Sequence, residues 1–429
     1  MMDPGLVALV VLALFLVLLL LRVPIAFALL LACLPFFLID PRMDEGLLAQ
    51  QVYAGIDSFV LLAVPFFILA AAIMNASQVT ERLIVLAQAL IGWIRGGLGI
   101  TNVATSMGFG GVSGSSNADV AGLGSVLIPQ MARRGYPVTY AVGVTAASSV
   151  IGSTIPPSIQ MVVWGSLTGT SIGALFLAGA VPGLLIGAGM MVVAYVIARR
   201  NDFPREQRPP LRDVMVALRD SLLALAIIVI VLGGILGGFV TATEAAVIAV
   251  LYALFLGLVV YRTLSLRDLP KIFRDSALFS VLPLFALAAA GALAYLIAYY
   301  RIPEVIQGAV EGVPAWAMLW VVAAVFLILG IFLDALPAMA IMVPVLAPAA
   351  DAAGLDPVHY GVVAVMSLAM GLITPPYGLC LLLAAKIGEV PVLRAVPATV
   401  PFGLVILGVI ALVILVPSIA LWLPGLVEP

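Results

Sequence analysis

The sequence predicts an all-α polytopic membrane protein, on the basis of its composition, its long apolar runs and an internal repeat. Hydrophobic residues make up 64% of the 429 positions and charged residues 9%, whereas a soluble globular protein has about a quarter charged residues. This composition excludes a soluble enzyme. Apolar runs near the roughly 20 residues that a bilayer requires follow one another along almost the whole chain. With short and broken segments included, we expect roughly ten to twelve crossings.

The charge balance, the cysteines and the histidine exclude further classes. A formal net charge of −2 leaves no basic surface for nucleic acid. Cys33 and Cys380 stand far apart in apolar runs, so they can build neither a disulfide framework nor a cysteine metal site. His359 is the only histidine, which rules out a histidine-rich metal site. Its position beside Asp356 and Pro357 predicts a structural residue in a turn.

Basic residues assign the sides of the membrane. Cytoplasmic loops collect Lys and Arg, so the arginine-rich residues 199–220 and the basic residues 262–274 are placed inside. The apolar residues 221–261 between them are long enough for two spans. Residues 40–58 contain Arg42 as their only basic residue and are placed outside, and by the same count both chain ends lie outside.

Three further patterns concern the membrane surface. Residues 1–22 carry Asp3 and no basic residue before their apolar run, which predicts a retained transmembrane helix rather than a signal peptide. Residues 44–58 mix Leu, Val and Tyr with Glu, Gln and Asp, which favours an amphipathic helix along the surface. The five tryptophans stand mostly near the ends of apolar runs, as in an interfacial aromatic belt.

An internal repeat links the two halves of the chain. Residues 64–72 match residues 282–290 in proline, phenylalanine, leucine and an alanine run. At an offset one residue larger the matches are Pro129 with Pro348, Gly135 with Gly354, Gly152 with Gly371, Pro156-Pro157 with Pro375-Pro376, and Pro182 with Pro401. Shared Gly or Ala is common by chance in such a sequence, but a shared Pro-Pro pair is not. We infer a duplication.

The two halves are predicted to have opposite orientations. The segment with Pro283 follows basic, cytoplasmic residues, whereas its counterpart with Pro65 follows the weakly charged outer segment. Inverted repeats are typical of secondary transporters, whose site lies near the midplane between the repeats. The predicted parts are N-terminal scaffold helices with the surface segment (residues 1–58), a first repeat with a hairpin and a broken helix (59–198), a cytoplasmic loop with two scaffold helices (199–275), and a second, inverted repeat with its own hairpin and broken helix (276–429).

A polar cluster within the apolar first half predicts a helical hairpin. Ser113, Gly114, Ser115, Ser116 and Asn117 interrupt the run, and irregular backbone is tolerated in a membrane only where it is buried in protein or lines a cavity. A chain that turns back at the serines presents oxygens suited to an alkali cation. The helix that restarts near Asn117 points N–H groups at an anion. Small-residue helix packing is the alternative, but it explains the glycines without the Ser-Ser-Asn cluster.

Broken helices are predicted at the two Pro-Pro pairs. Consecutive prolines remove two N–H donors and free the carbonyls of the preceding turn, as in transporters with unwound cation sites. A simple proline kink at a helix end is the alternative. The motif occurs in both halves, each time with a glycine and a hydroxyl close by, as in Gly152-Ser153-Thr154 and in Gly371 with Thr374. This recurrence favours a function.

Three acidic residues lie close to or within apolar runs: Asp119, Glu244 and Asp334. A charge at the membrane centre costs about 2.5–3.5 kcal/mol on insertion scales, so the position of each acid requires a structural or functional explanation. Asp334 aligns with Ser115 in the repeat, which predicts a second hairpin tip there. Glu244 is predicted to begin a scaffold helix, with Thr241 or Thr243 as its cap.

The sequence resembles that of the large membrane subunit of TRAP (tripartite ATP-independent periplasmic) transporters. The resemblance covers essentially the whole chain. It is carried by Ser113-Gly114-Ser115-Ser116, Ile128-Pro129, Gly135-Tyr136, Gly152-Ser153-Thr154-Ile155-Pro156-Pro157-Ser158, Ser171-Ile172-Gly173, Ala178-Gly179-Ala180-Val181-Pro182-Gly183, Phe332-Leu333-Asp334 and Thr374-Pro375-Pro376-Tyr377-Gly378. One departure is Ala242, where the family usually has proline, and it concerns only a scaffold turn.

The resemblance implies a non-enzymatic elevator transporter in the inner membrane of a bacterium or archaeon. It implies sodium-driven import of a small organic anion, a carboxylate or a sulfonate. The implied partners are a small membrane subunit of about four helices and a periplasmic substrate-binding protein. Carried onto this sequence, sodium is expected at Ser113, Gly114, Ser115, Gly152, Pro156, Asp334, Gly371, Thr374 and Pro375, and the anion at Ser116, Asn117, Ser153, Thr154, Pro157 and Pro376.

Three other classes remain as alternatives. A stand-alone sodium/anion symporter of a related superfamily would work without a binding protein. An intramembrane enzyme would need a nucleophile–base pair or a metal dyad, and the sequence shows no such constellation. Two hairpins in an inverted repeat are not typical of a channel, and a measurement of single-channel conductance would identify a channel.

Overall fold

The computed structural model describes residues 3–310 and 312–427, and within them every regular element is helical. Eight helices of this part are long and apolar enough to cross a membrane, or nine if a pair bent by 42° at residues 155–158 counts as one span. The number expected from the sequence also includes shorter segments, and three shorter apolar helices are present: Pro4–Leu20, Ile25–Ile39 and Pro357–Gly371.

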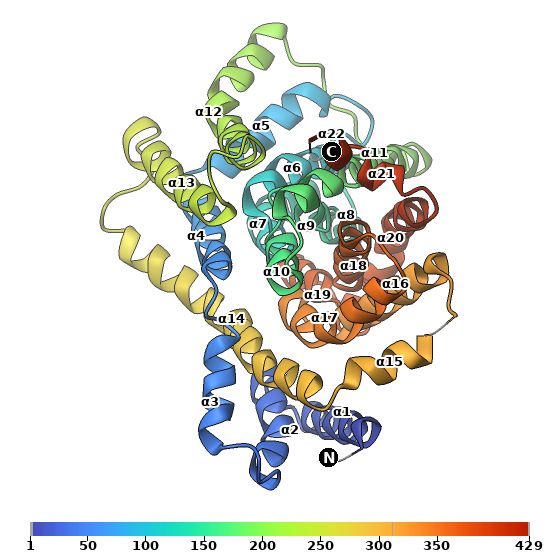
Figure 1. The fold of residues 1–429 in the computed structure, drawn as a ribbon. Coiled ribbons are helices and arrows are strands. Elements are labelled where there is room, and N and C mark those ends of the chain that lie inside the picture. Colours follow the sequence, from blue (N-terminus) through green and yellow to red (C-terminus); the bar gives the residue numbers. More distant parts are fainter. Residues whose placement is uncertain (1–2, 311, 428–429) are drawn as a thin grey trace.

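One set of helices forms an outer arc on one side of the molecule (Figure 1). Within the arc α14 is the common partner, since it packs against α2, α3 and α4. Its members are α1 (Pro4–Leu20), α2 (Ile25–Ile39), α3 (Glu45–Ala54), η1 (Phe59–Leu62), α4 (Ala63–Ala76), α12 (Leu211–Leu236), α13 (Ala242–Phe255), η2 (Leu256–Val260) and α14 (Leu269–Tyr299).

The remaining spans form a central group that the outer arc partly surrounds (Figure 1). Two short helices, α5 (Val79–Ile91) and α15 (Ile302–Val310), connect the arc to this group along the chain. The central group comprises α6 (Gly97–Ser113), α7 (Ser116–Arg133), α8 (Val138–Ser149), α9 (Ile151–Thr154), α10 (Ile159–Thr168), α11 (Ile172–Arg200), α16 (Ala315–Phe332), α17 (Ala335–Ala352), α18 (Pro357–Gly371), α19 (Leu379–Ile387) and α20 (Val392–Leu415), with α21 (Ser418–Leu421) and α22 (Pro424–Val427) after it.

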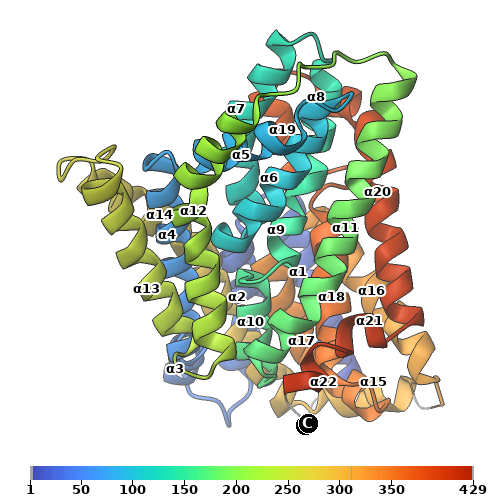
Figure 2. The ribbon, with the colours of Figure 1, turned by 90° about the horizontal axis from the view of Figure 1, so that it is seen from above.

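Positions that match in the repeat have matching local structure. Pro129 and Pro348 lie inside α7 and α17. Gly135 and Gly354 follow these helices with φ of 84° and 72°, a conformation that favours glycine. The hairpin α6–α7 and the hairpin α16–α17 approach each other from opposite ends of the molecule (Figure 2). The predicted inverted repeat is therefore confirmed.

The repeats differ in one element. Helix α14 is continuous for 31 residues around Pro283, whereas the equivalent stretch of the first repeat is divided into α3, η1 and α4. The division follows Gly55, which lies so close to α14 that an added Cβ would be 3.0 Å from the Cα of Gly291. The predicted surface segment is thus a helix, α3, whose end packs against α14.

Several local predictions can be compared with the structure. Thr241 and Glu244 form a reciprocal capping box at the start of α13, as predicted for the first of the two candidate caps. His359 is structural, and its Nε2 lies 2.9 Å from the carbonyl oxygen of Val413, but it stands in the first turn of α18 because Asp356 caps that helix. Trp164 does not belong to an interfacial belt, because it is buried against Phe326 and Tyr360.

The basic stretch at residues 199–220 is mostly helical. Helix α11 runs to Arg200 and α12 begins at Leu211, so only residues 201–210 form the loop between them. This loop and the one between α13 and α14 lie toward the same end of the molecule, and the described C-terminal end lies toward the other (Figure 2). That arrangement agrees with the positive-inside assignment. The terminal residues 1–2 and 428–429, whose sides were also predicted, lie outside the described residues.

Candidate functional site

The tip of the first hairpin is made by Gly114 and Ser115. Helix α6 ends at Gly114 in the left-handed conformation with φ of 61°, and Ser115 is the N-cap of α7, its hydroxyl accepting a hydrogen bond from the N–H of Ala118. A Cβ added at Gly114 would come within 2.7 Å of the carbonyl oxygen of Pro157. Glycine is needed here both for its backbone conformation and for the close approach to the broken helix.

Each hairpin tip packs against the broken helix of its own repeat. In the first repeat the N–H of Ile159 donates to the carbonyl of Gly114 at 3.0 Å. In the second repeat the N–H of Gly378 donates to the carbonyl of Ile331 at 3.3 Å. The same relation, a break that is hydrogen-bonded to a hairpin end, therefore occurs in both halves.

Paired glycines allow this close packing. In the first repeat Gly110 lies against Gly152, and a Cβ on Gly110 would come within 2.6 Å of the Cα of Gly152. In the second repeat Gly330 lies against Gly371, with a corresponding separation of 3.0 Å. Small residues let helix backbones approach closely in membrane proteins. Any side chain larger than hydrogen at these positions would push a hairpin away from its broken helix.

The two hairpin tips meet through Asn117 and Asp334. Asp334 is the N-cap of α17, and its Oδ1 accepts hydrogen bonds from the N–H of Ala335 at 2.8 Å and from Nδ2 of Asn117 at 3.2 Å. The thiol of Cys380 on α19 donates to Oδ1 of Asn117 at 3.3 Å. Asn117 therefore links both hairpins and the second broken helix.

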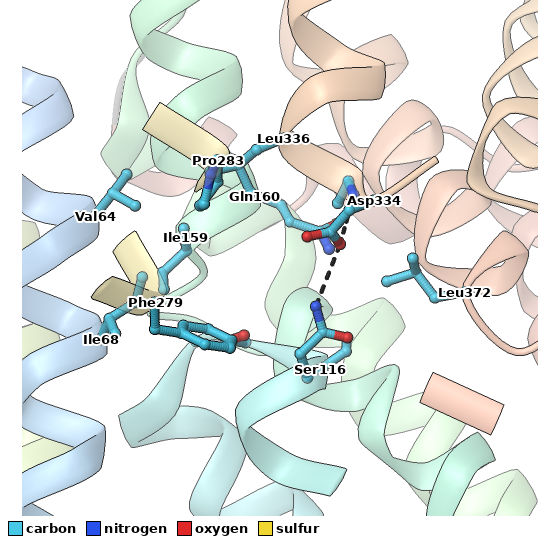
Figure 3. Close-up of a pocket in the computed structure, with 14 residues that line it drawn as sticks. Val64, Ile68, Ser116, Ile159, Gln160, Phe279, Pro283, Asp334, Leu336 and Leu372 are labelled. Carbon is cyan, nitrogen blue, oxygen red and sulfur yellow. Dashed lines mark hydrogen bonds between the residues drawn. The ribbon is translucent and has the colours of Figure 1, made fainter. Parts of the chain in front are cut away.

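A small cavity of ≈ 40 Å³ lies at this meeting point (Figure 3). A volume of this size admits only a few water molecules, so a small organic molecule requires the walls to move apart. The polar lining residues come from the hairpin tips and α10, which also contribute Ile159, Ala335 and Leu336, whereas α4 and α14 contribute only apolar residues. The lining residues are Val64, Ile68, Gly114, Ser115, Ser116, Asn117, Ile159, Gln160, Phe279, Pro283, Asp334, Ala335, Leu336 and Leu372.

Asp119 forms a second polar centre behind the first tip. Its side chain is buried, with 1% of the residue exposed, and the hydroxyl of Ser113 donates to its Oδ1. Its Oδ2 has no hydrogen-bond partner among the described residues and lies against the Cα of Gly152. A buried carboxylate with a free oxygen is costly unless a cation or donor satisfies it.

The structure brings some of the predicted residues together at the cavity and leaves others beside it. Gly114, Ser115, Ser116, Asn117 and Asp334 line it. Ser113 and Gly152 lie instead at Asp119. The predicted residues that do not line the cavity are Ser153, Thr154, Pro156, Pro157, Gly371, Thr374, Pro375 and Pro376.

The hydroxyls among these residues bond locally. Ser153 and Thr154 both donate to the carbonyl of Val150, at 2.8 and 3.2 Å. Thr374 donates to the carbonyl of Met370 at 2.9 Å. The hydroxyl oxygens can still accept a hydrogen bond or coordinate a cation, but these bonds hold the side chains against their own broken helices.

Four groups at the site were not among the sequence-based binding residues: Asp119, Gln160, Cys380 and the apolar pair Phe279 and Pro283. Asp119 was recognised as a costly acid without an assigned partner. Gln160 has a usable signal, since it is a large polar residue two positions after the first Pro-Pro-Ser motif, at the start of a mostly apolar helix. Nothing in the local sequence indicates that Phe279 and Pro283 face the hairpin tips.

Cationic side chains are absent from the lining of this cavity as described. Arg133, Arg134, Arg301 and Lys386 are all exposed, and Arg134 and Arg301 pair with Glu206 and Glu304 at the molecular surface. Positive potential at the hairpin tips therefore comes from the N-termini of α7 and α17.

The sequence matches the family described as tripartite ATP-independent periplasmic transporter, DctM component, over residues 12–419. It is 37% identical to the sialic acid TRAP transporter large permease protein SiaM of Vibrio cholerae, over 94% of this chain and 95% of that protein. It is 39% identical to the C4-dicarboxylate TRAP transporter large permease protein DctM of Pseudomonas aeruginosa, over 88% and 89%.

A third relative is the ectoine/5-hydroxyectoine TRAP transporter large permease protein UehC of Ruegeria pomeroyi, with 38% identity over 88% of this chain and 89% of that protein. Among solved structures, the YdaH transporter of Alcanivorax borkumensis superposes with a TM-score of 0.62 over 90% of both chains. Its identity of 14% shows a shared fold alone. The chain belongs to the DctM family and is the large permease subunit of a TRAP transporter, a multi-pass protein of the inner membrane.

Proposed function

We propose that this permease imports a small organic anion together with sodium ions, and that its central group moves as an elevator against the outer arc. The observation that carries the proposal is the meeting of two inverted hairpin tips at one small cavity, joined by the hydrogen bond from Asn117 to Asp334. Secondary transporters built from inverted repeats hold their substrate between the repeats, near the midplane.

The relatives support an organic anion as cargo. Their names specify sialic acid, C4-dicarboxylates, ectoine and, for a protein of Escherichia coli, 2,3-diketo-L-gulonate. These compounds share a carboxylate, and we take a carboxylate, or a sulfonate of similar charge, as the group that this chain binds. The proposed partners are a periplasmic binding protein that delivers the anion and a membrane subunit of about four helices.

The anion is held by helix dipoles and hydroxyls rather than by a salt bridge. Helix α7 begins at Ser116 and directs its free N–H groups toward the cavity end, where Ser116 and Asn117 are the first lining side chains. The first N–H groups of a helix have no partner within the helix and attract negative charge. A buried arginine would be costly in the same position without a fixed partner.

Sodium supplies the remaining positive charge, and we propose one binding region in each repeat. The first contains Ser113, Gly114, Ser115, Gly152 and Pro156, to which the free carboxylate oxygen of Asp119 is added. The second contains Asp334, Gly371, Thr374 and Pro375. Hard oxygen donors suit an alkali cation. Because each region includes a hairpin tip that also lines the cavity, sodium and anion binding strengthen each other by the same factor.

The elevator proposal follows from how the two groups of helices meet. On the side of the outer arc the cavity is lined by apolar side chains, Val64 and Ile68 on α4 and Phe279 and Pro283 on α14. An apolar surface has no directional bonds to break when another group slides along it. Helices α5 and α15 connect the two groups and pack against both, so they are placed to act as arms.

Uptake in reconstituted vesicles tests this function. The membrane complex is reconstituted with its binding protein, and the labelled anion is the compound that stabilises that binding protein. Uptake is expected only with an inward sodium gradient and only with the binding protein present. Equal uptake with potassium or choline in place of sodium would refute sodium coupling. Full uptake without the binding protein would instead indicate a stand-alone symporter.

A further inference from the structure

Two residues that line the cavity each carry a buried polar atom with no partner among the described residues: the hydroxyl of Ser116 and the amide oxygen Oε1 of Gln160. Both side chains are buried, with 2% and 4% of the residue exposed. Other polar atoms of the lining are already engaged in hydrogen bonds, among them Oδ1 of Asp334. Ser115 caps α7, and Asn117 is bonded at both ends of its amide to Asp334 and Cys380.

Gln160 is not explained as a packing residue. It is the second residue of α10, and its neighbours Ile159, Met161, Val162 and Val163 are buried and apolar. A leucine or methionine would fill a similar volume without leaving a polar atom unpaired. Buried polar atoms are nearly always hydrogen-bonded, and one that is not calls for an explanation. Figure 3 shows the side chain among the residues that surround the cavity.

We infer that Gln160 is a specificity-determining residue, which accepts a hydrogen bond from a hydroxyl or amine that the transported anion carries in addition to its acidic group. The inference rests on the proposed function and extends it. An amide oxygen can only accept, so its partner must be a donor. The acidic group itself lies at the N-terminus of α7 with Ser116, and the carbon skeleton lies against the apolar side chains of α4 and α14.

The consequence is a preference between matched anions. A site built to bond a substrate hydroxyl discriminates strongly against the analogue that lacks it, because the buried partner is then left unpaired. This permease therefore prefers malate to succinate, lactate to propionate and 3-hydroxybutyrate to butyrate, whichever chain length fits best. A protonated amine in place of the hydroxyl is the second source of the same donor, and the pair aspartate and succinate tests it with two compounds that are both anions.

The experiment measures binding to the purified membrane complex in sodium, without the binding protein, so that the selectivity of the binding protein does not enter. Thermal stabilisation is measured with the four matched pairs and with a wider panel of carboxylates of different lengths. Stabilising compounds are expected to carry a donor group. Gln160→Met is expected to weaken them by roughly tenfold or more, whereas Gln160→Asn, which retains a neutral amide acceptor, is expected to keep the preference for donor-bearing anions. Gln307→Met on α15, outside the cavity, is the matched control and leaves binding unchanged.

The contrary results distinguish a wrong role for Gln160 from a wrong proposed function. Ligands that lose affinity in Ser116→Ala but not in Gln160→Met would overturn the role of Gln160 and leave the proposed transport site intact. A Gln160→Met variant that binds anions normally but needs more sodium would identify Gln160 as a cation ligand and also overturn the inference. If none of the carboxylates stabilises the wild-type complex, the proposed function fails at its substrate site. A Gln160→Met complex that elutes and unfolds like wild type shows that the substitution is tolerated. If it does not, Gln160→Asn provides a second test.

Discussion

At the scale of single residues, the environment of Asp119 explains why a carboxylate can remain within the membrane part of this chain. Its Oδ1 accepts from Ser113, while its Oδ2 lies unpaired against Gly152. A sodium ion would satisfy the free oxygen. We therefore expect Asp119→Asn, which preserves shape and removes charge, to raise the sodium concentration for half-maximal uptake by roughly tenfold, a loss of about 1.4 kcal/mol in sodium binding.

Glu244→Gln is the matched control, because Glu244 is an acid of the outer arc that is engaged with Thr241 in a capping box. Sodium dependence measured by uptake in vesicles should be unchanged in this variant. If both variants need the same sodium concentration as wild type, Asp119 is not a cation ligand.

Gly152 provides a second prediction at this scale. A methyl group at this position would enter the space of the carboxylate of Asp119 on the hairpin helix α7. Gly152→Ala should abolish sodium-dependent uptake and destabilise the protein by about 1–3 kcal/mol, the usual cost of overpacking. Gly408→Ala, with no atom within 4 Å of the added Cβ, should leave uptake intact. Normal uptake by Gly152→Ala would show that the hairpin does not need this close contact.

At the scale of elements, a polar cluster of Asp40, Arg42 and Tyr300 connects the turn after α2 to the end of α14 through hydrogen bonds. Arg42 donates to both carboxylate oxygens of Asp40, at 2.9 and 2.7 Å, and the hydroxyl of Tyr300 donates at 3.2 Å. The Arg42 guanidinium is the main cause that holds the pKa of the Asp40 carboxyl well below its usual range. The stability that this cluster contributes is therefore fully present above the ordinary aspartate pKa and is lost only as the pH falls through the lowered value.

Asp40→Asn should accordingly lower the thermal midpoint of the purified complex by the same amount from pH 8 down to about pH 5, since the ordinary aspartate pKa is about 3.9. Asp57→Asn, which changes an exposed carboxylate of the same segment, serves as the control and should have no effect. A difference between Asp40→Asn and wild type that already shrinks between pH 7 and pH 5 would contradict the assignment.

The hairpins, the broken helices and their packing show which structural features could be predicted from the sequence and which could not. The hairpin tips and the breaks could be predicted because irregular polar backbone inside a membrane has few physical explanations. The contacts of Gln160 and Cys380, and the wall formed by Phe279 and Pro283, could not be predicted from local sequence. Which helix faces which is decided by close packing between segments that are all apolar. The burial of Trp164 was missed for the same reason, since a tryptophan near the end of a run can face either lipid or a neighbouring helix.

At the scale of the whole molecule, opposite orientation of the two repeats requires the basic loop at residues 201–210 and the end of α22 to lie on different sides of the membrane. Single cysteines at Arg205 and Leu426 test this with an impermeant maleimide added to intact cells. Leu426→Cys should label and Arg205→Cys should not. Wild type is the blank, because both native cysteines are buried. The reverse labelling pattern would overturn the orientation.

Movement of the central group against the outer arc is the central claim, and one pair of serines tests it most directly. The hydroxyls of Ser58, before η1 in the outer arc, and Ser166, on α10 in the central group, lie 3.3 Å apart. Cysteines at both positions change the side chains little and can be bridged by mercuric ion. Thr168 and Thr170, which are half-buried like the test pair and whose hydroxyls lie 2.7 Å apart within the central group, are the matched pair, and bridging cysteines at these positions should proceed at the same rate with and without sodium and anion.

The measurement is uptake by Ser58→Cys/Ser166→Cys vesicles before and after bridging. An elevator must separate these two residues in each cycle, so bridging should abolish uptake, dithiothreitol should restore it, and sodium with anion should slow the bridging reaction. If the bridged protein transports at the wild-type rate, the central group does not move against the outer arc and the proposed mechanism is wrong.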